Sequence, residues 1–386
     1  MRILLNGAPM LGRLTGIGQY GLSLLKALLE SPGLEAIGVF DGREVLAPAA
    51  FLARLSQTAD AARNQRLKSI LRRVWPSCRE WADCARRVRL ARQTRHTRWS
   101  LFHEPNFVSP QYTLPLVTTV HDMGYLRYPQ FLPKDRLLWL RRNMARTLGR
   151  SRVILADSHF TRRELLELCP TVDAGRVMVA QLGVDFDYFN NPLHDERVPE
   201  VRRRLDLPER FILYLGTLEP RKNLQGLIQA YDLLPAELRK SHQLVLAGMR
   251  GWNQTYFRRE LAQLRRRHAL REVGYVDQDD VPALMRAASV FCFPSFYEGF
   301  GLPPLEAAAC GTPVVSSRAA ALTEVLADGA VYVDPHSPQD IASGIERVLT
   351  NSSLEQRLRQ AGPARAAQLR WERCASRTVE AYRAAA

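Results

Sequence analysis

The sequence predicts an α/β fold made of two doubly wound domains, each with a mostly parallel sheet covered by helices. Short apolar runs alternate with helical stretches up to about residue 190, and such runs are typical of buried parallel strands. Residues 190–199 are polar and broken by prolines, which is typical of a linker. The alternation restarts at Phe211, which indicates a second domain of the same class.

The apolar runs define the expected strands and domain boundaries. In the first half they lie at 2–6, 39–40, 101–104, 116–121, 153–156 and 177–182. In the second half they lie at 211–215, 244–247, 272–276, 290–293, 313–316 and 330–333. We therefore predict a first domain over 1–190, a second domain over 205–366 and a C-terminal helix over 367–386.

Composition excludes several classes of protein. The chain has 386 residues, enough for two or three domains with ample cores. It contains no run of about 18 uncharged apolar residues, so we expect no transmembrane helix, and its first apolar run is too short for a secretory signal. Its six cysteines are scattered without a C-x-x-C pair, which predicts reduced thiols and a cytoplasmic location rather than disulfides or a metal site.

The chain is strongly basic, with a formal net charge of +15 and an isoelectric point near 10.0. Such a charge favours a polyanionic partner. However, only five of the 54 basic residues are lysine, and arginine dominance of this kind also arises from genomic base composition. Both explanations of the overall charge stay open.

A local basic cluster spans residues 63–98, where twelve arginines and lysines stand against two acidic residues. Within it, apolar residues recur at helical spacing: Leu67, Ile70, Leu71, Val74 and Trp75. A basic helix with an apolar face and a tryptophan is typical of membrane-surface binding, which predicts a peripheral position at the inner face of the cell membrane. The alternative is a core-facing helix with a solvated arginine face.

The stretch 296–306 has the composition of an anion-binding loop that leads into a helix. Gly299 and Gly301 allow close approach of a ligand, two prolines follow, and good helix formers continue to Cys310. The amides and dipole of such a helix N-terminus favour phosphate. Glu298 and Glu306 frame the site, and because carboxylates repel phosphate we expect them to bind sugar hydroxyls. The alternative for Glu306 is simple complementation of the helix dipole.

A second loop, 216–223, places Arg221 and Lys222 between the strand at 211–215 and a helix expected to begin near Asn223. Fixed cations stabilise the charge that develops on a diphosphate leaving group. The alternative is a solvated pair of surface cations. Lys222 is one of few lysines in an arginine-rich chain, which favours a specific role.

The first half contributes weaker candidates. Gly16 and Gly18 lie in a loop between the first strand and a helix, which suits phosphate binding but lacks the G-x-G-x-x-G spacing, and a tight turn fits equally well. Two expected strands end in the pairs 103–104 and 121–122, where ligands of open α/β sheets bind. We take His121 as a site residue and His103 as structural.

Several of these strings together resemble the retaining nucleotide-sugar glycosyltransferases of family 4. The resemblance lies in the E-x7-E pattern from Glu298 to Glu306 and in the strings at 216–223, 274–276 and 309–315, with matches at Gly16, Gly18 and His121. It covers motifs in both halves, and in this order they are highly specific. It implies a GT-B fold, in which two Rossmann-like domains face across a cleft and the C-terminal helix returns to the N-terminal domain.

The resemblance also implies roles for individual residues. It assigns catalytic roles to His121, Glu298, Arg221 and Lys222. Binding of the donor falls to Gly16, Gly18, Gly216, Arg221, Lys222, Tyr275, Val276, Phe300, Gly301, Leu302 and Glu306, with Glu306 on the ribose. Several family members have an arginine where this chain has Thr217, which leaves one phosphate contact in doubt. Transfer with retention and without a metal is implied.

The expected function is transfer of a sugar from a nucleotide-diphosphate sugar to a saccharide acceptor in cell-surface polysaccharide synthesis. We expect the acceptor to be lipid-linked, because the basic segment 63–98 indicates binding to a membrane surface. The resemblance favours GDP-mannose or a related donor, and a UDP-sugar with a soluble acceptor is the alternative. A glycoside hydrolase would leave the Arg–Lys pair without purpose. A nucleic-acid binder fits the charge, but no such motif is present. The D-x-D string at 277–279 precedes an expected helix, so we expect no metal there.

Overall fold

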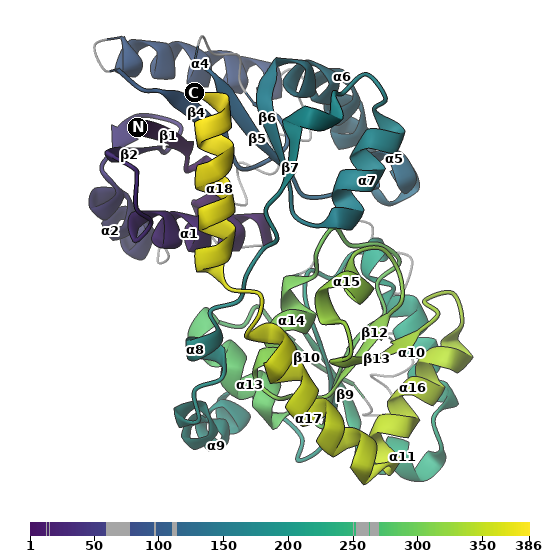
Figure 1. Ribbon diagram of the computed structural model, residues 1–386. Coiled ribbons are helices and arrows are strands. Elements are labelled where there is room, and N and C mark those ends of the chain that lie inside the picture. Colours follow the sequence, from purple (N-terminus) through teal and green to yellow (C-terminus); the bar gives the residue numbers. More distant parts are fainter. Residues whose placement is uncertain are drawn as a thin grey trace. The chain divides into compact units, whose positions relative to one another are not determined.

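The computed structural model describes residues 1–12, 14, 16–58, 78–95, 98–109, 114–249, 251, 262 and 270–386. They form two compact units. Unit 1 comprises Met1–Tyr125, Lys134–Gln181 and Trp371–Ala386, and unit 2 comprises Leu126–Pro133 and Leu182–Arg370. Each unit contains one sheet with helices packed against it, which confirms the predicted class of two doubly wound α/β domains (Figure 1).

The sheet of unit 1 has seven strands in the order β3-β2-β1-β4-β5-β6-β7. Their bounds are β1 (Arg2–Asn6), β2 (Ala36–Phe40), β3 (Val45–Leu46), β4 (Leu101–Glu104), β5 (Leu116–Val120), β6 (Ser151–Ala156) and β7 (Val177–Val179). All neighbours pair in parallel except β3, which is antiparallel to β2. The central strands are buried on both faces, because helices cover both faces of a parallel sheet.

Helices α1 (Gly16–Leu29), α2 (Pro48–Thr58), α4 (Cys78–Thr94), α6 (Lys134–Arg150), α7 (His159–Leu168) and α18 (Trp371–Ala385) belong to unit 1, and α5 (Gly124–Arg127) spans the point where the chain leaves it. The sequence at 133–150 predicts a basic helix, and the structure confirms it as α6. The start of α1 corrects the expected loop, since Gly16 and Gly18 lie in its first turn.

The C-terminal helix α18 is part of unit 1, where it packs against α1 and β6 (Figure 1). A buried polar network joins it to the sheet. The Tyr382 hydroxyl lies 2.7 Å from His103 Nδ1, and His103 Nε2 lies 2.9 Å from the Thr119 hydroxyl. The return of the last helix to the first sheet, which the family resemblance implied, is therefore present.

The sheet of unit 2 has six parallel strands in the order β10-β9-β8-β11-β12-β13. They are β8 (Phe211–Leu215), β9 (Gln243–Ala247), β10 (Leu270–Gly274), β11 (Val290–Phe293), β12 (Val314–Ser317) and β13 (Ala330–Val333). The strand order reverses between β8 and β11. Ligands of open α/β sheets bind beyond the strand ends at such a switch point.

The helices of unit 2 are α8 (Phe186–Phe189), α9 (Leu193–Leu205), α10 (Leu224–Leu233), α11 (Ala236–Ser241), α13 (Val281–Ala287), α14 (Leu302–Ala309), α15 (Leu322–Leu326), α16 (Pro338–Thr350) and α17 (Ser352–Ala366). Helix α9 shows that the predicted linker at 190–199 is wrong. It contains Pro199, yet Val201 is fully buried and Arg197 bonds Asp280 beside α13. These tertiary contacts outweigh the one hydrogen bond that proline removes.

The apolar positions of the basic segment, Leu67–Trp75, lie outside the described residues. The sequence also predicts an arginine-rich helix at 254–268, where the structure describes residue 262 alone, so this prediction is not tested. Of the basic segment, the described part is mainly α4. Within the described part of the chain, no helix is both long and apolar enough to span a membrane.

Candidate active site

The loop that follows β11 leads directly into α14, as the sequence predicted. Gly301 is the N-cap of α14 and has a φ of 102°, a left-handed conformation that favours glycine. A Cβ on Gly301 would lie 2.5 Å from Cδ2 of Leu322 on α15. Glycine is therefore required here both by the backbone conformation and by the packing of α15 against the loop.

The N-terminus of α14 presents few amide donors, because Pro303 and Pro304 in its first turn have no N–H. The Leu305 amide already donates to the Gly301 carbonyl. The amides of Phe300, Gly301 and Leu302 have no backbone acceptor within the described part of the structure. These are main-chain donors that remain available to an anion, and they belong to the three residues of this loop to which the family resemblance assigns donor binding.

The loop after β8 is held rigidly by Asn223, the N-cap of α10. Its Oδ1 accepts from the Gly226 amide at 3.1 Å, and its Nδ2 donates to the carbonyls of Pro294 and Pro335. The predicted helix start at Asn223 is confirmed. The same side chain ties this loop to the loop after β11, because Pro294 follows that strand directly.

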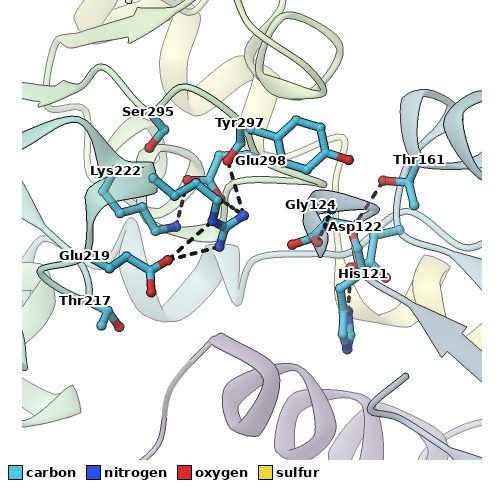
Figure 2. Close-up of polar contacts among 12 residues, drawn as sticks. His121, Asp122, Gly124, Thr161, Thr217, Glu219, Lys222, Ser295, Tyr297 and Glu298 are labelled. Carbon is cyan, nitrogen blue, oxygen red and sulfur yellow. Dashed lines mark hydrogen bonds and ion pairs between the residues drawn. The ribbon is translucent and has the colours of Figure 1, made fainter. Parts of the chain in front are cut away.

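Two cations and two carboxylates form one cluster at the switch point (Figure 2). Lys222 Nζ lies 2.7 Å from Glu298 Oε1, and Arg221 Nη1 lies 3.7 Å from Glu298 Oε2. Arg221 also pairs with Glu219 at 3.3 Å. The structure therefore brings together Arg221, Lys222 and Glu298 from two separate loops, and their charges are balanced by Glu219.

The two cations have different surroundings. Arg221 donates to Glu219 through Nε and Nη2 and to the Tyr297 carbonyl through Nη1, and its own carbonyl accepts from the Phe296 amide. Arg221 therefore holds the two loops together. Lys222 donates to Glu298 alone among the described residues, and an ammonium group carries three N–H donors. Lys222 is the cation better placed to bind a ligand directly.

Glu306 points from α14 and is partly exposed. No hydrogen-bond or ion-pair partner of its carboxylate is present among the described residues. Burial raises the pKa of Glu306 to about 7, so the carboxyl group is close to half ionised at neutral pH. An acidic group that has no partner among the residues with described positions, on the helix that follows the loop, suits a pair of ligand hydroxyls.

The remaining candidates of unit 2 follow the ends of two strands, β8 and β10, which β9 separates. Gly216 follows β8, and its carbonyl leaves no room for a Cβ on Gly248, which shows close backbone packing. Tyr275 and Val276 follow β10, the edge strand, two strands away from β8. Val276 is buried and Tyr275 is partly exposed. The structure places all of them in unit 2, as predicted, without assigning a ligand.

A segment that sequence reasoning missed also contributes to unit 2. Residues 126–133 lie between β5 and α6 in the chain, yet they belong to this unit. Phe131 stacks on Phe296 at 5.7 Å between ring centroids, and Tyr128 lies 5.5 Å from Tyr297. The loop after β11 is thus packed on its outer side by aromatic rings from a distant segment, a long-range contact without a local sequence signal.

In unit 1, the structure gives the two glycine candidates different surroundings. A Cβ on Gly18 would lie 3.0 Å from the Pro9 carbonyl, so Gly18 serves the packing of α1. Among the described residues, nothing lies within 4 Å of a Cβ built on Gly16. Of these two glycines, Gly16 is therefore the one with open space beside it in the described part of the structure.

His121 follows β5 and has an acceptor at each ring nitrogen. Nδ1 lies 2.7 Å from Asp157 Oδ2, and Nε2 lies 2.7 Å from the Pro105 carbonyl. Burial opposes the charged imidazolium, but the Asp157 carboxylate outweighs it and raises the pKa of His121 above its ordinary value. In this arrangement both ring nitrogens are engaged within unit 1, which favours a charged, positioned side chain over a proton carrier.

Asp157 was missed by sequence reasoning, although a signal was present. It follows β6, the neighbour of β5, just as His121 follows β5, so both side chains lie at the same edge of the sheet. His103, taken as structural, has both ring nitrogens bonded inside the core, and burial lowers its pKa to about 3.

The D-x-D string does not gather ligands for a metal. Asp280 is the N-cap residue of α13, as its place before that helix predicts, but its side chain makes no capping hydrogen bond and pairs with Arg197 and Arg204. Throughout the described ranges, no group of three or more histidine, cysteine or acidic side chains could hold a metal ion.

Known structures share this fold over nearly the whole chain. Sucrose-phosphate synthase from Thermosynechococcus elongatus superimposes with a TM-score of 0.72 at 21% identity, covering 99% of this chain and 98% of that one. WaaG, a glycosyltransferase involved in lipopolysaccharide biosynthesis, gives 0.69 at 15% identity, with 98% of each chain covered. Both are GT-B glycosyltransferases, so the fold is GT-B.

Sequence comparison gives the family. The model described as "Glycosyltransferase Family 4" matches residues 45–188, and that of "Glycosyl transferases group 1" matches residues 199–365. The O-antigen chain mannosyltransferase B of Escherichia coli is 35% identical over 99% of this chain and 100% of its own length. The serotype-specific mannosyltransferase WbdA of Escherichia coli is 34% identical over 69% of this chain and 32% of its own length. The chain is therefore a glycosyltransferase and belongs to family 4.

The packing around Gly301 leads to a prediction. Gly301→Ala should lower the free energy of unfolding by about 2–4 kcal/mol, because left-handed strain adds to the clash with Leu322. Gly311→Ala is the matched control: its φ is 74° but the nearest atom to its Cβ lies at 3.6 Å, so only strain of about 1–2 kcal/mol applies. Urea unfolding of both variants measures the difference, and equal losses would show that Leu322 does not constrain the loop.

Proposed function

We propose that this glycosyltransferase transfers a mannosyl group from a nucleotide-diphosphate mannose to a saccharide acceptor in cell-surface polysaccharide synthesis. GDP-mannose is favoured over UDP-sugars. The names of the two Escherichia coli relatives, an O-antigen chain mannosyltransferase and a serotype-specific mannosyltransferase, support the sugar and the pathway class. The observation that carries the proposal is the Lys222–Glu298 pair beside the amide donors of α14.

The diphosphate of the donor binds at the oriented hydrogen-bond donors of the two loops. Lys222 and the amides of Phe300, Gly301 and Leu302 receive its oxygens, while Arg221 holds the two loops in place through Glu219 and the Tyr297 carbonyl. Donors that are already fixed stabilise the charge that develops on the leaving group without reorganising. The reaction is metal-independent, because these groups take the role of a cation.

Transfer occurs with retention of configuration at the anomeric carbon. The bond from that carbon to the leaving diphosphate oxygen breaks, the bond to the acceptor oxygen forms on the same face, and the acceptor proton passes to the leaving diphosphate. Glu298 lies near the donor sugar, where its carboxylate also fixes Lys222. His121, whose charged form Asp157 favours, contributes as a positioned side chain rather than as a proton carrier.

The acceptor is a lipid-linked saccharide, and the enzyme acts as a peripheral protein at the inner face of the membrane. The basic segment 63–98 supports this part of the proposal. In its described portion, α4 carries the exposed Arg89 and Arg92 on a helix that also packs Leu90 into the core. Exposed cations on such a helix suit an anionic surface.

A donor screen tests the proposal. Thermal unfolding is followed with GDP-mannose, UDP-glucose and a dTDP-sugar at equal concentrations, and GDP-mannose should raise the melting temperature most, because a ligand that binds the folded state stabilises it by mass action. The anomeric configuration of the product, read by NMR, should match that of the donor. Stabilisation by UDP-glucose without any by GDP-mannose would contradict the proposed donor.

Lys222→Met should lower kcat by about 10²–10³-fold, the effect of removing one donor from a developing negative charge. The fold should survive, because Glu298 keeps Arg221 at 3.7 Å. Lys240→Met is the matched control, since Lys240 is an exposed lysine of the same unit paired with Glu237. Steady-state kinetics should place the control within about twofold of the wild type. A folded Lys222→Met enzyme with normal kcat would show that Lys222 does not take part in the reaction.

Binding of the donor should depend on the ionisation of Glu306. Its folded pKa of about 7 lies above the ordinary value of 4.5, so the free protein holds a proton there at pH 6. Ribose hydroxyls donate to the ionised form, so affinity should rise about tenfold from pH 6 to pH 8, with a proton released on binding at the lower pH.

Calorimetry with a nucleotide-sugar measures this effect, because its diphosphate has no terminal phosphate group that titrates near pH 6. Glu306→Gln should abolish the pH dependence and the proton release, and it serves as the control. The same affinity at pH 6 and pH 8 in the wild type would exclude Glu306 as the hydroxyl ligand.

A further inference from the structure

The segment Leu126–Pro133 belongs to unit 2, although the chain on either side of it belongs to unit 1, and it carries two aromatic rings in a fixed arrangement. Pro129–Phe131 form one 3₁₀ turn, in which the Phe131 amide donates to the Tyr128 carbonyl at 3.1 Å. Side chains three residues apart on such a turn lie on the same side of it. Tyr128 and Phe131 are accordingly stacked, with 5.6 Å between ring centroids and 5° between ring planes.

Each ring of this pair packs on one residue of the loop that follows β11. Phe131 stacks on Phe296, with 5.7 Å between centroids and 19° between planes. Tyr128 lies 5.5 Å from Tyr297, centroid to centroid. Phe296 and Tyr297 are the two residues directly before Glu298. The ring pair therefore contacts the loop immediately ahead of the carboxylate that it presents to the site.

The backbone of the same two loop residues is bonded to Arg221. The Phe296 amide donates to the Arg221 carbonyl at 3.0 Å, and Arg221 Nη1 donates to the Tyr297 carbonyl at 3.2 Å. The ring of Tyr297 points away from Lys222 (Figure 2). Arg221 thus fixes the main chain of the loop, and the ring contacts fix its side chains. Together they limit rotation of the backbone that carries Glu298.

The ring pair lies at the margin of the unit rather than in its core. Tyr128 and Phe131 are both half-buried, whereas Phe291 and Phe293 of β11 are fully buried. Half-buried rings remove less apolar surface from water, so they contribute less to the stability of the whole unit. A role at the active-site loop explains their position better than a role in the core does.

We propose that Phe131, supported by Tyr128, is a positioning residue for glycosyl transfer. Its ring holds Phe296 so that the Glu298 carboxylate keeps Lys222 Nζ at 2.7 Å, aimed at the leaving diphosphate. The inference rests on the proposed function in placing Lys222 at that diphosphate. Donors stabilise a developing charge best when they are fixed beforehand, so a looser loop lowers turnover more than it weakens donor binding.

Hydrogen exchange tests the positioning without any substrate. Phe131→Leu removes the ring but keeps an apolar side chain, and exchange of the Phe296 amide should become about tenfold faster, because ring contacts that oppose opening of the loop are lost. Phe131→Tyr keeps the ring and is the matched control, with a change of less than about twofold. Mass spectrometry of fragments covering residues 294–302 measures the rates. Equal exchange in the wild type and Phe131→Leu would overturn the proposal, whichever donor the enzyme uses.

Steady-state kinetics with GDP-mannose and octyl mannoside separates positioning from stability. In folded Phe131→Leu, kcat should fall about tenfold while the KM for GDP-mannose stays within about twofold, and Phe131→Tyr should restore kcat to within about twofold of the wild type. A lower melting temperature with unchanged kcat would make Phe131 merely structural and would overturn the proposal. A higher KM with unchanged kcat would overturn it as well.

A double-mutant cycle shows whether Phe131 acts through Phe296. Phe296→Leu should lower kcat by itself. The variant Phe131→Leu/Phe296→Leu should lose no more than about twofold beyond the larger single loss, because each substitution removes the same ring contact. Losses that multiply would show that the two rings act independently, which contradicts the proposal.

The outcomes for the two proposals are distinct. Failure of the donor screen in the wild type would contradict the proposed function, and hydrogen exchange would still decide the role of Phe131. A normal donor screen together with normal exchange and normal kcat in Phe131→Leu would overturn the role of Phe131 alone.

Discussion

The geometry of the active-site loops depends on the ion pair between Lys222 and Glu298. The two residues follow β8 and β11, the neighbouring strands between which the sheet of unit 2 reverses its order. Both side chains are largely buried, so water solvates neither charge well. Each charge is therefore stabilised mainly by the other. Arg221 and Asn223 reinforce the same junction through main-chain carbonyls. The loop that presents the amides of α14 is therefore held by residues from a different loop.

This junction has no excess of positive charge. Arg221 and Lys222 are balanced by Glu219 and Glu298, so an anion gains most from donors that are oriented, such as the amides before the two prolines of α14.

The fold class and most of the site could be predicted because their signals are local. Apolar runs alternating with helical stretches marked the strands, and the glycines and prolines at 299–304 marked the start of α14. The predictions were wrong or missing where contacts between residues far apart in the chain determine the structure. The stretch 190–199 was expected to be a linker, but contacts with α13 hold it as α9 despite Pro199. No local pattern in the sequence of segment 126–133 indicates that its aromatic rings pack against Phe296 and Tyr297.

The sequence by itself determined two α/β domains, a glycine-rich loop before a helix, and the presence of Arg221, Lys222, Glu298 and Glu306, because backbone conformation, periodicity and motif spacing are properties of neighbouring residues. Only the tertiary structure decided that Lys222 pairs with Glu298, that Arg221 ties the loops together, and that Asp157 makes a hydrogen bond with Nδ1 of His121. Such partners are far apart in the chain, and the register of parallel strands, which brings their ends to one edge, is set by the packing of the whole sheet.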